Sequence, residues 1–318
     1  MASIKSITVK GFRNILSTTI DLQDITCLLA PNNYGKSNIL SAIGFGYNFM
    51  ISPSEKKTLM MQSIADISIN KSIAGKPFVF TLEGSLEMHF APRLKVHKSG
   101  ARFSIGDWVP SYLFDLKKED KSTYDYLLSA IQILLPNVES MEPIPISLRT
   151  QVDKDVPFTY PDSYDIMVKE VYNNQATRLQ YLSTGSMKIL FLLTCIIRAR
   201  KEGTQLLFIE ELENSIHPNL MQALLSVIVE MKGDTKLLFT SHSPNVAKYL
   251  TAKQLYVGLP SDKGVVDFRT IKPSKVKSVL SIAGAGDMAL GEYLFELMLD
   301  TETDPSLIDL FFTPKNEE

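Results

Sequence analysis

Residues 25–40, ITCLLAPNNYGKSNIL, constrain the fold more than any other stretch of this sequence. An apolar run ends at Ala30, a polar turn follows, and Lys36 and Ser37 open an amphipathic segment, which predicts a strand, a turn and a helix start. Except at its first position, the stretch matches the pattern G-x-x-x-x-G-K-[ST]. In that pattern backbone N–H groups wrap phosphates, the lysine meets the terminal phosphates and the hydroxyl residue holds Mg²⁺. Gly35 allows close backbone approach. Taken alone, this match leaves an ordinary polar strand-to-helix turn open as the alternative.

The first glycine of that pattern is missing, because Ala30 stands in its place. Alanine at positive φ is strained by about 1 kcal/mol or more. We therefore expect the loop to start at negative φ.

Composition bounds the class of protein. The chain has 318 residues, of which 45% are hydrophobic and 21% charged, and its formal net charge is −2. These values are normal for a globular protein and exclude a generally basic nucleic-acid coat, so DNA binding would need a local patch. Cys27 and Cys195 lie in apolar runs, which indicates buried thiols in a reducing compartment. The longest apolar run, residues 189–197, is too short to span a bilayer, and residues 1–9 give no signal-peptide pattern. We expect a cytoplasmic protein with no membrane partner.

Strand-like alternation precedes and follows the phosphate loop. Residues 4–9 and 17–22 predict two antiparallel strands before it, and residues 78–82 and 86–90 predict further strands of a sheet beside the main one. Basic residues at 93–102 surround a Ser-Gly turn. A solvated hairpin is favoured there over a phosphate contact, because no aromatic residues lie between the charges.

The middle of the chain mixes helical and strand-like patterns. Apolar residues at helical spacing predict a helix over residues 124–134, whereas residues 164–168 and 179–182 are strand-like. No heptad repeat is found, and the interval between the phosphate loop and residue 183 leaves no room for coiled-coil arms.

A second anion site is predicted at residues 182–186, LSTGS, which precede a strongly apolar helix. Ser183 or Thr184 can cap this helix, and Gly185 lets an approaching group reach the free N–H donors. Taken by itself, this stretch is better explained by an ordinary capped buried helix.

Two carboxylates follow the buried strand at residues 205–209. The carboxyl ends of strands in open α/β sheets are where ligands bind. Glu210 suits binding of Mg²⁺ through water, and Glu211 suits orientation or deprotonation of an attacking water. The alternative is an acidic start to the next helix.

His242 follows a third buried strand, residues 236–240, and Pro244 is expected to begin the next helix. Because the strand ends should share one edge, we expect His242 within reach of a γ-phosphate. His89 and His97 are interpreted as ordinary loop histidines.

These motifs occur in one order, and together they resemble the ATP-binding-cassette (ABC) ATPase heads of the RecF, SMC and OLD (overcoming-lysogenization-defect) class. The resemblance rests on IKSITVKGFRN, APNNYGKSN, LSTGS, LLFIEELENSIHP and TSHSP, within residues 4–250. It implies an α/β P-loop NTPase fold with a mostly parallel central sheet, an antiparallel side sheet and a helical lobe. It further implies one head over residues 1–318, with a nucleotide-binding lobe at 1–108 and 205–270, a helical lobe at 109–204 and a C-terminal helical segment at 271–318 that suits partner binding.

The resemblance also implies a role for each motif residue, with ATP and Mg²⁺ as cofactors. Glu211 would be the catalytic glutamate, His242 the switch histidine, and Ser37 and Glu210 the magnesium ligands. The nucleotide-binding residues implied are Arg13, Asn14, Asn32, Asn33, Gly35, Lys36, Ser37, Asn38, Ser183 and Gly185. Asn214 and Ser215 would communicate between two sites, and Gln62 is a weak candidate for the Q-loop glutamine.

Several residues depart from the family pattern. Tyr34 is bulky where small residues are usual, Glu210 replaces the commoner aspartate, and Leu212 stands where proline is frequent. Together with Ala30, these departures leave nucleotide binding expected and suggest slow hydrolysis.

The resemblance implies a dimer, because one chain of this fold does not bring LSTGS and the phosphate loop to the same phosphate. Two chains placed head to tail around ATP would form a switch that hydrolysis resets. OLD-type ATPases often carry a TOPRIM nuclease domain, for which the chain after His242 shows no pattern. We therefore expect control of a separate nuclease or toxin, as in prokaryotic anti-phage defence.

Three alternatives stay open. A RecF-like repair ATPase would bind duplex DNA in an ATP-dependent and salt-sensitive manner. A scaffold would bind ATP without hydrolysing it. A metallohydrolase built from Glu210, Glu211, Glu213, His217 and His242 is the least favoured, because the phosphate loop would then have no role.

Overall fold

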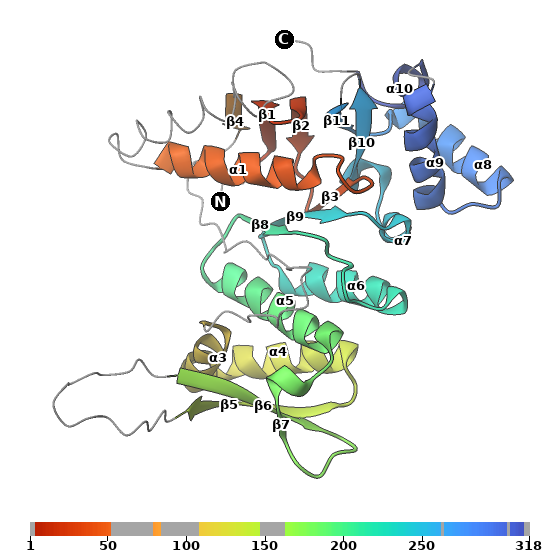
Figure 1. The fold of residues 1–318 in the computed structure, drawn as a ribbon. Helices are drawn as coiled ribbons and strands as arrows, with labels where there is room; N and C mark the ends of the chain where they lie inside the picture. Colours follow the sequence, from red (N-terminus) through yellow and green to blue (C-terminus); the bar gives the residue numbers. More distant parts are fainter. Residues whose placement is uncertain are drawn as a thin grey trace. The chain divides into compact units, whose positions relative to one another are not determined.

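The structure is a computed structural model that describes residues 4–51, 79–83, 108–146, 163–261, 264–303 and 306–314. The strand predicted at 86–90, the basic hairpin at 93–102 and Gln62 lie outside these residues. The chain divides into two compact units, one of residues 1–95, 203–213 and 234–318 and one of residues 96–202 and 214–233 (Figure 1). In the part of the chain that is described, no helix has the length and apolar character needed to cross a bilayer.

The first unit is built on an eight-stranded sheet with the strand order β4-β1-β2-β11-β10-β3-β9-β8. Its strands are β1 (Ser6–Phe12), β2 (Ile15–Asp21), β3 (Ile25–Leu29), β4 (Val79–Glu83), β8 (Leu206–Ile209), β9 (Lys236–Ser241), β10 (Leu255–Ser261) and β11 (Val265–Arg269). Its helices are α1 (Lys36–Ile51), α7 (Pro244–Ala247), α8 (Val276–Ala285), α9 (Leu290–Thr303) and α10 (Ser306–Phe311), with the short 3₁₀ turns η3 (Ala252–Gln254) and η5 (Pro273–Lys275).

Three neighbouring parallel strands, β3, β9 and β8, form one end of this sheet. Strand β9 pairs in parallel with β3 on one side and with β8 on the other. Every residue of β3 and β8 is buried, as expected for parallel strands covered on both faces. Because the three strands run in the same direction, their carboxyl ends lie at one edge of the sheet. The three segments predicted to carry the site follow these three ends.

The other half of the sheet is antiparallel. Strand β1 pairs with β2 and β4, and β10 pairs with β11. The strand predicted at 78–82 is therefore present as β4. A parallel contact between Ile15 and Val266 joins β2 to β11, and β10 pairs in parallel with β3, so all eight strands form one continuous sheet. The predicted fold class, a mostly parallel central sheet with antiparallel strands at its side, is confirmed.

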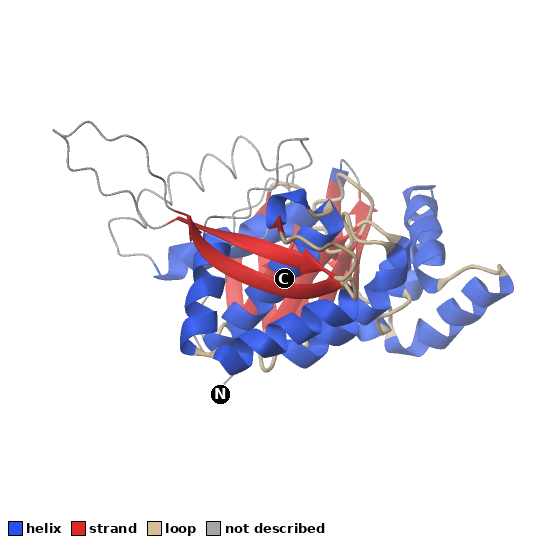
Figure 2. Cartoon of the chain, turned by 90° about the horizontal axis from the view of Figure 1, so that it is seen from below, coloured by secondary structure: helices blue, strands red, loops and turns tan. Residues whose placement is uncertain are grey.

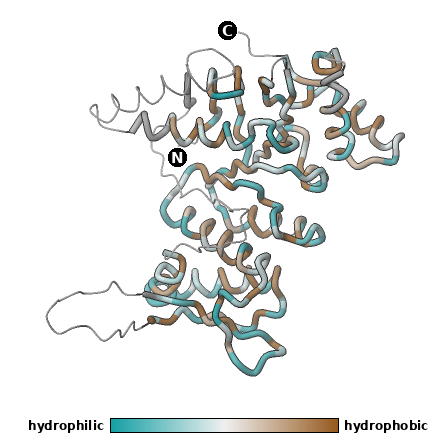
Figure 3. The backbone as a smooth tube through the Cα atoms, viewed as in Figure 1, coloured by the Kyte–Doolittle hydropathy of each residue, from teal (hydrophilic) through white to brown (hydrophobic). Residues whose placement is uncertain are grey.

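The second unit combines helices with a separate antiparallel sheet of order β5-β6-β7 (Figure 2). Its elements are α3 (Trp108–Glu119), α4 (Lys121–Leu134), β5 (Val138–Ile146), β6 (Ser163–Glu170), β7 (Thr177–Arg178), η1 (Leu179–Tyr181), α5 (Thr184–Lys201), η2 (Pro218–Leu220) and α6 (Met221–Met231). Helix α4 buries Tyr124, Leu127, Ile131 and Leu134 on one face, which confirms the helix predicted from their spacing. Hydrophobic residues also run along α5 and α6 (Figure 3).

One predicted strand is wrong. Residues 179–182 form a 3₁₀ turn, because the Leu182 N–H donates to the Leu179 carbonyl at 3.0 Å. Leu179 is buried, whereas the Tyr181 side chain is 74% exposed. The alternating apolar residues in this segment therefore belong to a turn that precedes helix α5, and not to a strand paired in a sheet.

Candidate functional site

The loop between β3 and α1 has the conformation expected of a phosphate loop. Gly35 has a φ of 74° and Asn33 a φ of 70°, so the chain turns through left-handed backbone just before α1 begins at Lys36. Ala30 avoids positive φ, as predicted, and its N–H donates to the Ser241 carbonyl at 3.2 Å. Its methyl group packs against β10, where a Cβ on Gly258 would lie 2.8 Å away. Alanine is therefore compatible with the start of this loop.

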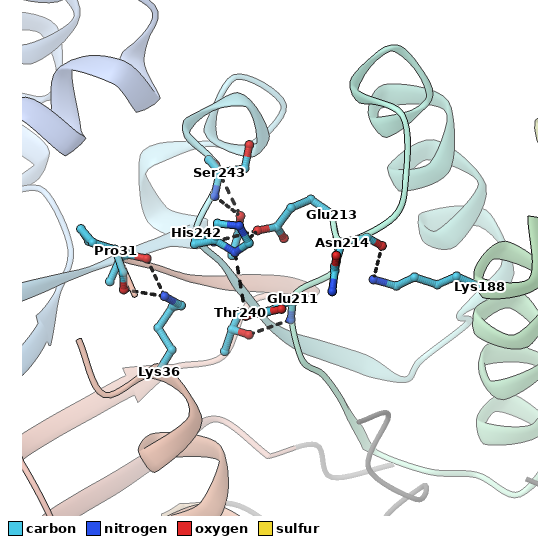
Figure 4. A network of polar contacts seen from close by, with 11 residues as sticks. Pro31, Lys36, Lys188, Glu211, Glu213, Asn214, Thr240, His242 and Ser243 are labelled. Atoms are coloured by element: carbon cyan, nitrogen blue, oxygen red, sulfur yellow. Dashed lines mark hydrogen bonds and ion pairs between the residues drawn. The ribbon is translucent and has the colours of Figure 1, made fainter. Parts of the chain in front are cut away.

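The side chain of Lys36 folds back into the loop between β3 and α1. Its side chain is buried, and Nζ donates to the carbonyls of Ala30 and Pro31, each at 2.6 Å (Figure 4). A lysine ammonium surrounded by the carbonyl groups of its own loop is positioned to exchange these acceptors for phosphate oxygens. Asn32, Asn33 and Ser37 are exposed along the same loop.

The turn between β1 and β2 reaches the start of α1. Arg13 Nη1 donates to Asn38 Oδ1, and Asn38 Nδ2 donates to Asn14 Oδ1, both at 2.7 Å. A Cβ on Gly35 would lie 2.8 Å from that same Asn14 oxygen, so the glycine is required by space as well as by φ. The structure thus places Arg13, Asn14, Gly35 and Asn38 together, although they come from two parts of the sequence.

The acidic segment after β8 is tied to the neighbouring strand β9. The Glu211 N–H donates to the Thr240 hydroxyl at 2.9 Å, and the Leu212 N–H donates to the Thr240 carbonyl at 3.2 Å. Glu211 itself has a φ of 47°, a conformation that non-glycine residues adopt rarely and that is common at functional sites. The second bond accounts for Leu212, because proline at this position has no N–H to donate. The sequence did not reveal the role of Thr240.

His242 follows β9 and lies beside the acidic segment. Its Nδ1 atom is 3.0 Å from Glu213 Oε1 and 4.0 Å from Glu211 Oε1, and its backbone N–H donates to Glu213 Oε1 at 2.8 Å (Figure 4). The predicted meeting of the phosphate loop, Glu211 and His242 at one sheet edge is therefore present in the described geometry. The sequence suggested Glu213 only as a metal ligand of the metallohydrolase alternative, and it did not predict the contact with His242.

A buried thiol lies under this edge. Burial raises the pKa of Cys27 well above its ordinary value, Glu213 raises it further and Lys36 opposes the shift. Cys27 therefore stays a neutral thiol at neutral pH, and the charges above it are carried by Lys36 and the glutamates.

The residues predicted to bind magnesium supply oxygen donors. Ser37 is the second residue of α1, and Glu210 directly follows β8. A hydroxyl and a carboxylate fit Mg²⁺, which commonly takes one or two protein ligands and completes its shell with water and phosphate oxygens. Among the residues that the structure describes, no group of three or more His, Cys, Asp or Glu side chains is arranged to hold a metal ion. The metallohydrolase alternative therefore finds no ligand set there.

In the second unit, Ser183 caps helix α5. The Ser186 N–H donates to Ser183 Oγ at 3.1 Å, and α5 begins at Thr184, so Ser183 and not Thr184 is the cap. Gly185 lies in the first turn, and a Cβ there would be 2.5 Å from the Ser215 carbonyl oxygen. Glycine at 185 is thus needed for close packing of two backbones.

The segment at Asn214 and Ser215 makes a second contact with α5, in addition to the packing of Ser215 against Gly185. Lys188 is buried, and its Nζ donates to the Asn214 carbonyl at 2.7 Å (Figure 4). Ser215 has a φ of 64°. The LSTGS helix and the segment that follows the glutamates are therefore in direct contact within this unit, and Lys188 is a contact that the sequence did not indicate.

Comparisons with known proteins bear on the family and the fold of the chain. The family described as "AAA domain, putative AbiEii toxin, Type IV TA system" matches residues 25–248. No curated protein matches the chain in sequence. A solved structure of the SmcHead bound to the C-winged helix domain of ScpA is 14% identical, with a TM-score of 0.56, covering 86% of this chain and 99% of the other. The Smc head with an extended coiled coil from Pyrococcus furiosus, bound to the C-terminal domain of ScpA, is 13% identical, with a TM-score of 0.51 and coverages of 89% and 100%. At such low identity, these likenesses show the fold.

Proposed function

Because the chain belongs to the AAA domain family described as "putative AbiEii toxin, Type IV TA system", an ATPase domain with the fold of an SMC head, we propose that it binds MgATP and hydrolyses it slowly at the ends of β3, β8 and β9. One observation carries the proposal: three neighbouring parallel strands deliver Lys36, Glu211 and His242 to one edge of one sheet. Ligands of open α/β sheets bind at such an edge.

The chemistry divides among these three residues. Lys36 exchanges its two loop carbonyls for phosphate oxygens of ATP and offsets their charge. Glu211 accepts a proton from the attacking water, whose oxygen bonds to the γ-phosphorus as the bond to the ADP oxygen breaks. His242 contacts the transferred phosphate. Magnesium, when held by Ser37 and Glu210, supplies charge neutralisation of the phosphates.

We place Ser183 and Gly185 at the γ-phosphate of a second copy. The start of α5 is a capped helix N-terminus of an 18-residue helix, and such ends favour anions. Two copies bound head to tail would each complete the other's site, so ATP would hold the dimer together and loss of phosphate would release it. The expected behaviour is ATP-dependent dimerisation that hydrolysis reverses.

We propose that this switch controls a separate effector. The family description names a toxin of a toxin–antitoxin system, and the similar SMC heads were solved with a domain of ScpA bound. Both support a partner protein, for which the C-terminal helical segment at residues 271–318 is our proposed binding surface. A nuclease or toxin with a role in anti-phage defence is the effector class that we favour.

A phosphate-release assay tests the activity. Wild-type protein and Glu211→Gln are compared with MgATP, and nucleotide binding is measured in parallel. We expect the wild type to release phosphate slowly and Glu211→Gln to bind ATP while its rate falls by a factor of about 100 or more. Equal background rates in both proteins, with binding intact, would instead favour the non-hydrolysing scaffold.

The repair-ATPase alternative has its own test. Duplex DNA is titrated with and without ATP at several salt concentrations. ATP-dependent binding that weakens steeply with salt would favour the RecF-like function. We expect no ATP-dependent binding.

A further inference from the structure

Glu213 contacts His242 at two atoms, the backbone nitrogen and the ring nitrogen Nδ1. Its Oε1 atom accepts a hydrogen bond from the His242 N–H at 2.8 Å and lies 3.0 Å from His242 Nδ1. The other oxygen, Oε2, is buried and makes no hydrogen bond with the described residues. A carboxylate that gives both of its close contacts to one histidine constrains the main chain and the ring together.

The position of Glu213 is itself fixed by the sheet. It follows Leu212, which is 1% exposed and whose N–H is bonded to the Thr240 carbonyl. The Glu213 side chain is 10% exposed, against 23% for Glu211. Electrostatic attraction is stronger where less water screens it, so the nearer and more buried Glu213 outweighs Glu211 as the partner of the ring.

Histidine chemistry gives this contact a consequence. In a neutral imidazole one nitrogen carries the proton, and the group that faces that nitrogen decides which one it is. Nδ1 lies at ion-pair distance from Glu213 without hydrogen-bond geometry, so a small rotation of the ring completes an N–H to carboxylate bond. With Nδ1–H directed at Glu213, Nε2 faces the substrate, and in the imidazolium form its N–H donates to a phosphate oxygen.

We propose that Glu213 is a positioning residue for His242: it holds the backbone and keeps an Nδ1 proton turned toward its own carboxylate, so that Nε2 faces the transferred phosphate and donates to it when the ring carries both protons. This inference rests on the proposed function for its effect on rate. In this arrangement the two glutamates have different roles. Glu211 acts on the attacking water, and Glu213 orients the histidine.

The contact is tested first without nucleotide, by NMR of ¹⁵N-labelled histidine in the whole chain at pH 8. The His242 signals are identified as those lost in His242→Asn. A proton on Nδ1, in the neutral ring or in the imidazolium, supports the proposal. A neutral ring with its proton on Nε2 in the wild type overturns it. This measurement does not depend on ATP hydrolysis, and its assignment needs only that His242→Asn folds.

The effect on rate is tested with Glu213→Gln, Glu213→Asp and the control Glu230→Gln, an exposed glutamate on α6. We expect Glu213→Gln to lower kcat about tenfold or more with little change in KM, as expected for a group acting through a catalytic residue. Glu213→Asp should recover part of the rate and Glu230→Gln should match the wild type. An unchanged kcat in Glu213→Gln overturns the proposal while the ATPase function stands. A wild type without ATPase activity overturns the proposed function instead, and the NMR result still decides the contact.

Discussion

The hydroxyl of Thr240 accepts a hydrogen bond from the backbone N–H of Glu211 at 2.9 Å, and Glu211 there has a φ of 47°. The strained backbone of the proposed catalytic glutamate is thus held by a threonine hydroxyl of the neighbouring strand β9. Thr240 is 1% exposed, so water does not replace it easily. Position 240 therefore links the sheet to the geometry on which hydrolysis would depend.

Thr240→Val removes this hydroxyl while keeping the shape of the side chain. We expect the unpaired Glu211 N–H to reduce the free energy of unfolding by about 1–3 kcal/mol. We also expect kcat to fall with MgATP affinity retained, because the binding loop after β3 is untouched. Thr240→Ser, which keeps the hydroxyl, should behave like the wild type. Chemical denaturation and phosphate release measure both effects, and equal kcat in the valine and serine variants would contradict the account.

Asn14→Ala breaks the bond from Asn38 to the turn between β1 and β2. Asn14 is 7% exposed, so its loss leaves a part-buried amide without its acceptor. We expect MgATP affinity to fall about five- to tenfold, which corresponds to about 1–1.4 kcal/mol. Thr19→Ala, which removes the Thr8–Thr19 side-chain contact elsewhere on the β1–β2 pair, serves as the control and should bind ATP normally. Calorimetry measures the affinities, and equal loss in both variants would show a general effect on the hairpin.

Gly185→Ala and Gly284→Ala place the same methyl group in different surroundings. At 185 it would lie 2.5 Å from the Ser215 carbonyl oxygen, whereas at 284, on α8, nothing lies within 4 Å. We expect Gly185→Ala to destabilise the protein by about 1–3 kcal/mol and Gly284→Ala to stabilise it by about 0.5–1 kcal/mol. Denaturation curves test the contrast. A neutral Gly185→Ala would mean that the LSTGS helix is not packed on Ser215.

Asp120 gives a pH-dependent prediction in the second unit. A hydrogen bond from Lys201, followed by those from Thr123, lowers the pKa of the Asp120 carboxyl well below its ordinary value. The ionised form is therefore favoured in the folded protein, so its contribution is present above the unfolded pKa of about 3.9 and is lost as pH falls through the lower folded pKa. Asp120→Asn, which can still cap α4, should lower Tm at pH 7, and the difference from wild type should shrink below about pH 4. Asp125→Asn, an exposed change on the same helix, is the control. A difference that does not vary with pH would contradict the assignment.

Much of the fold could be predicted from local sequence patterns. The buried strand before Ala30, the helix at 124–134 and the strand before His242 could all be predicted, because apolar runs and spacing report burial directly. Residues 179–182 could not, since a short alternation of apolar residues fits a 3₁₀ turn as well as a strand. The continuation of one sheet through Ile15 and Val266 was also beyond reach, because it pairs segments about 250 residues apart.

The site was predictable where a motif names its own chemistry. Lys36, Glu211 and His242 follow strands that the sequence marks clearly, so their common edge could be foreseen. The supporting contacts could not, because a threonine or a lysine inside a strand or helix gives no sign of its partner. Thr240 and Lys188 belong to this group, and Glu213 was considered only as a metal ligand. The contact between Glu213 and His242 was indicated in the sequence only by the SHSP and EELEN segments. Each segment follows a strand, and neighbouring parallel strands place the residues that follow them side by side.

Calorimetric titration of MgATP into the wild type and two lysine variants tests the central claim most directly. Lys36→Ala removes the loop ammonium, and Lys236→Ala removes a matched lysine whose Nζ also bonds two carbonyls, those of Ile4 and Leu22, each at 2.8 Å, at the opposite end of β9. We predict saturable binding by the wild type and by Lys236→Ala, and loss of binding in Lys36→Ala. Equal affinity in all three proteins, or no binding by the folded wild type, would contradict the assignment of this sheet edge as a nucleotide site.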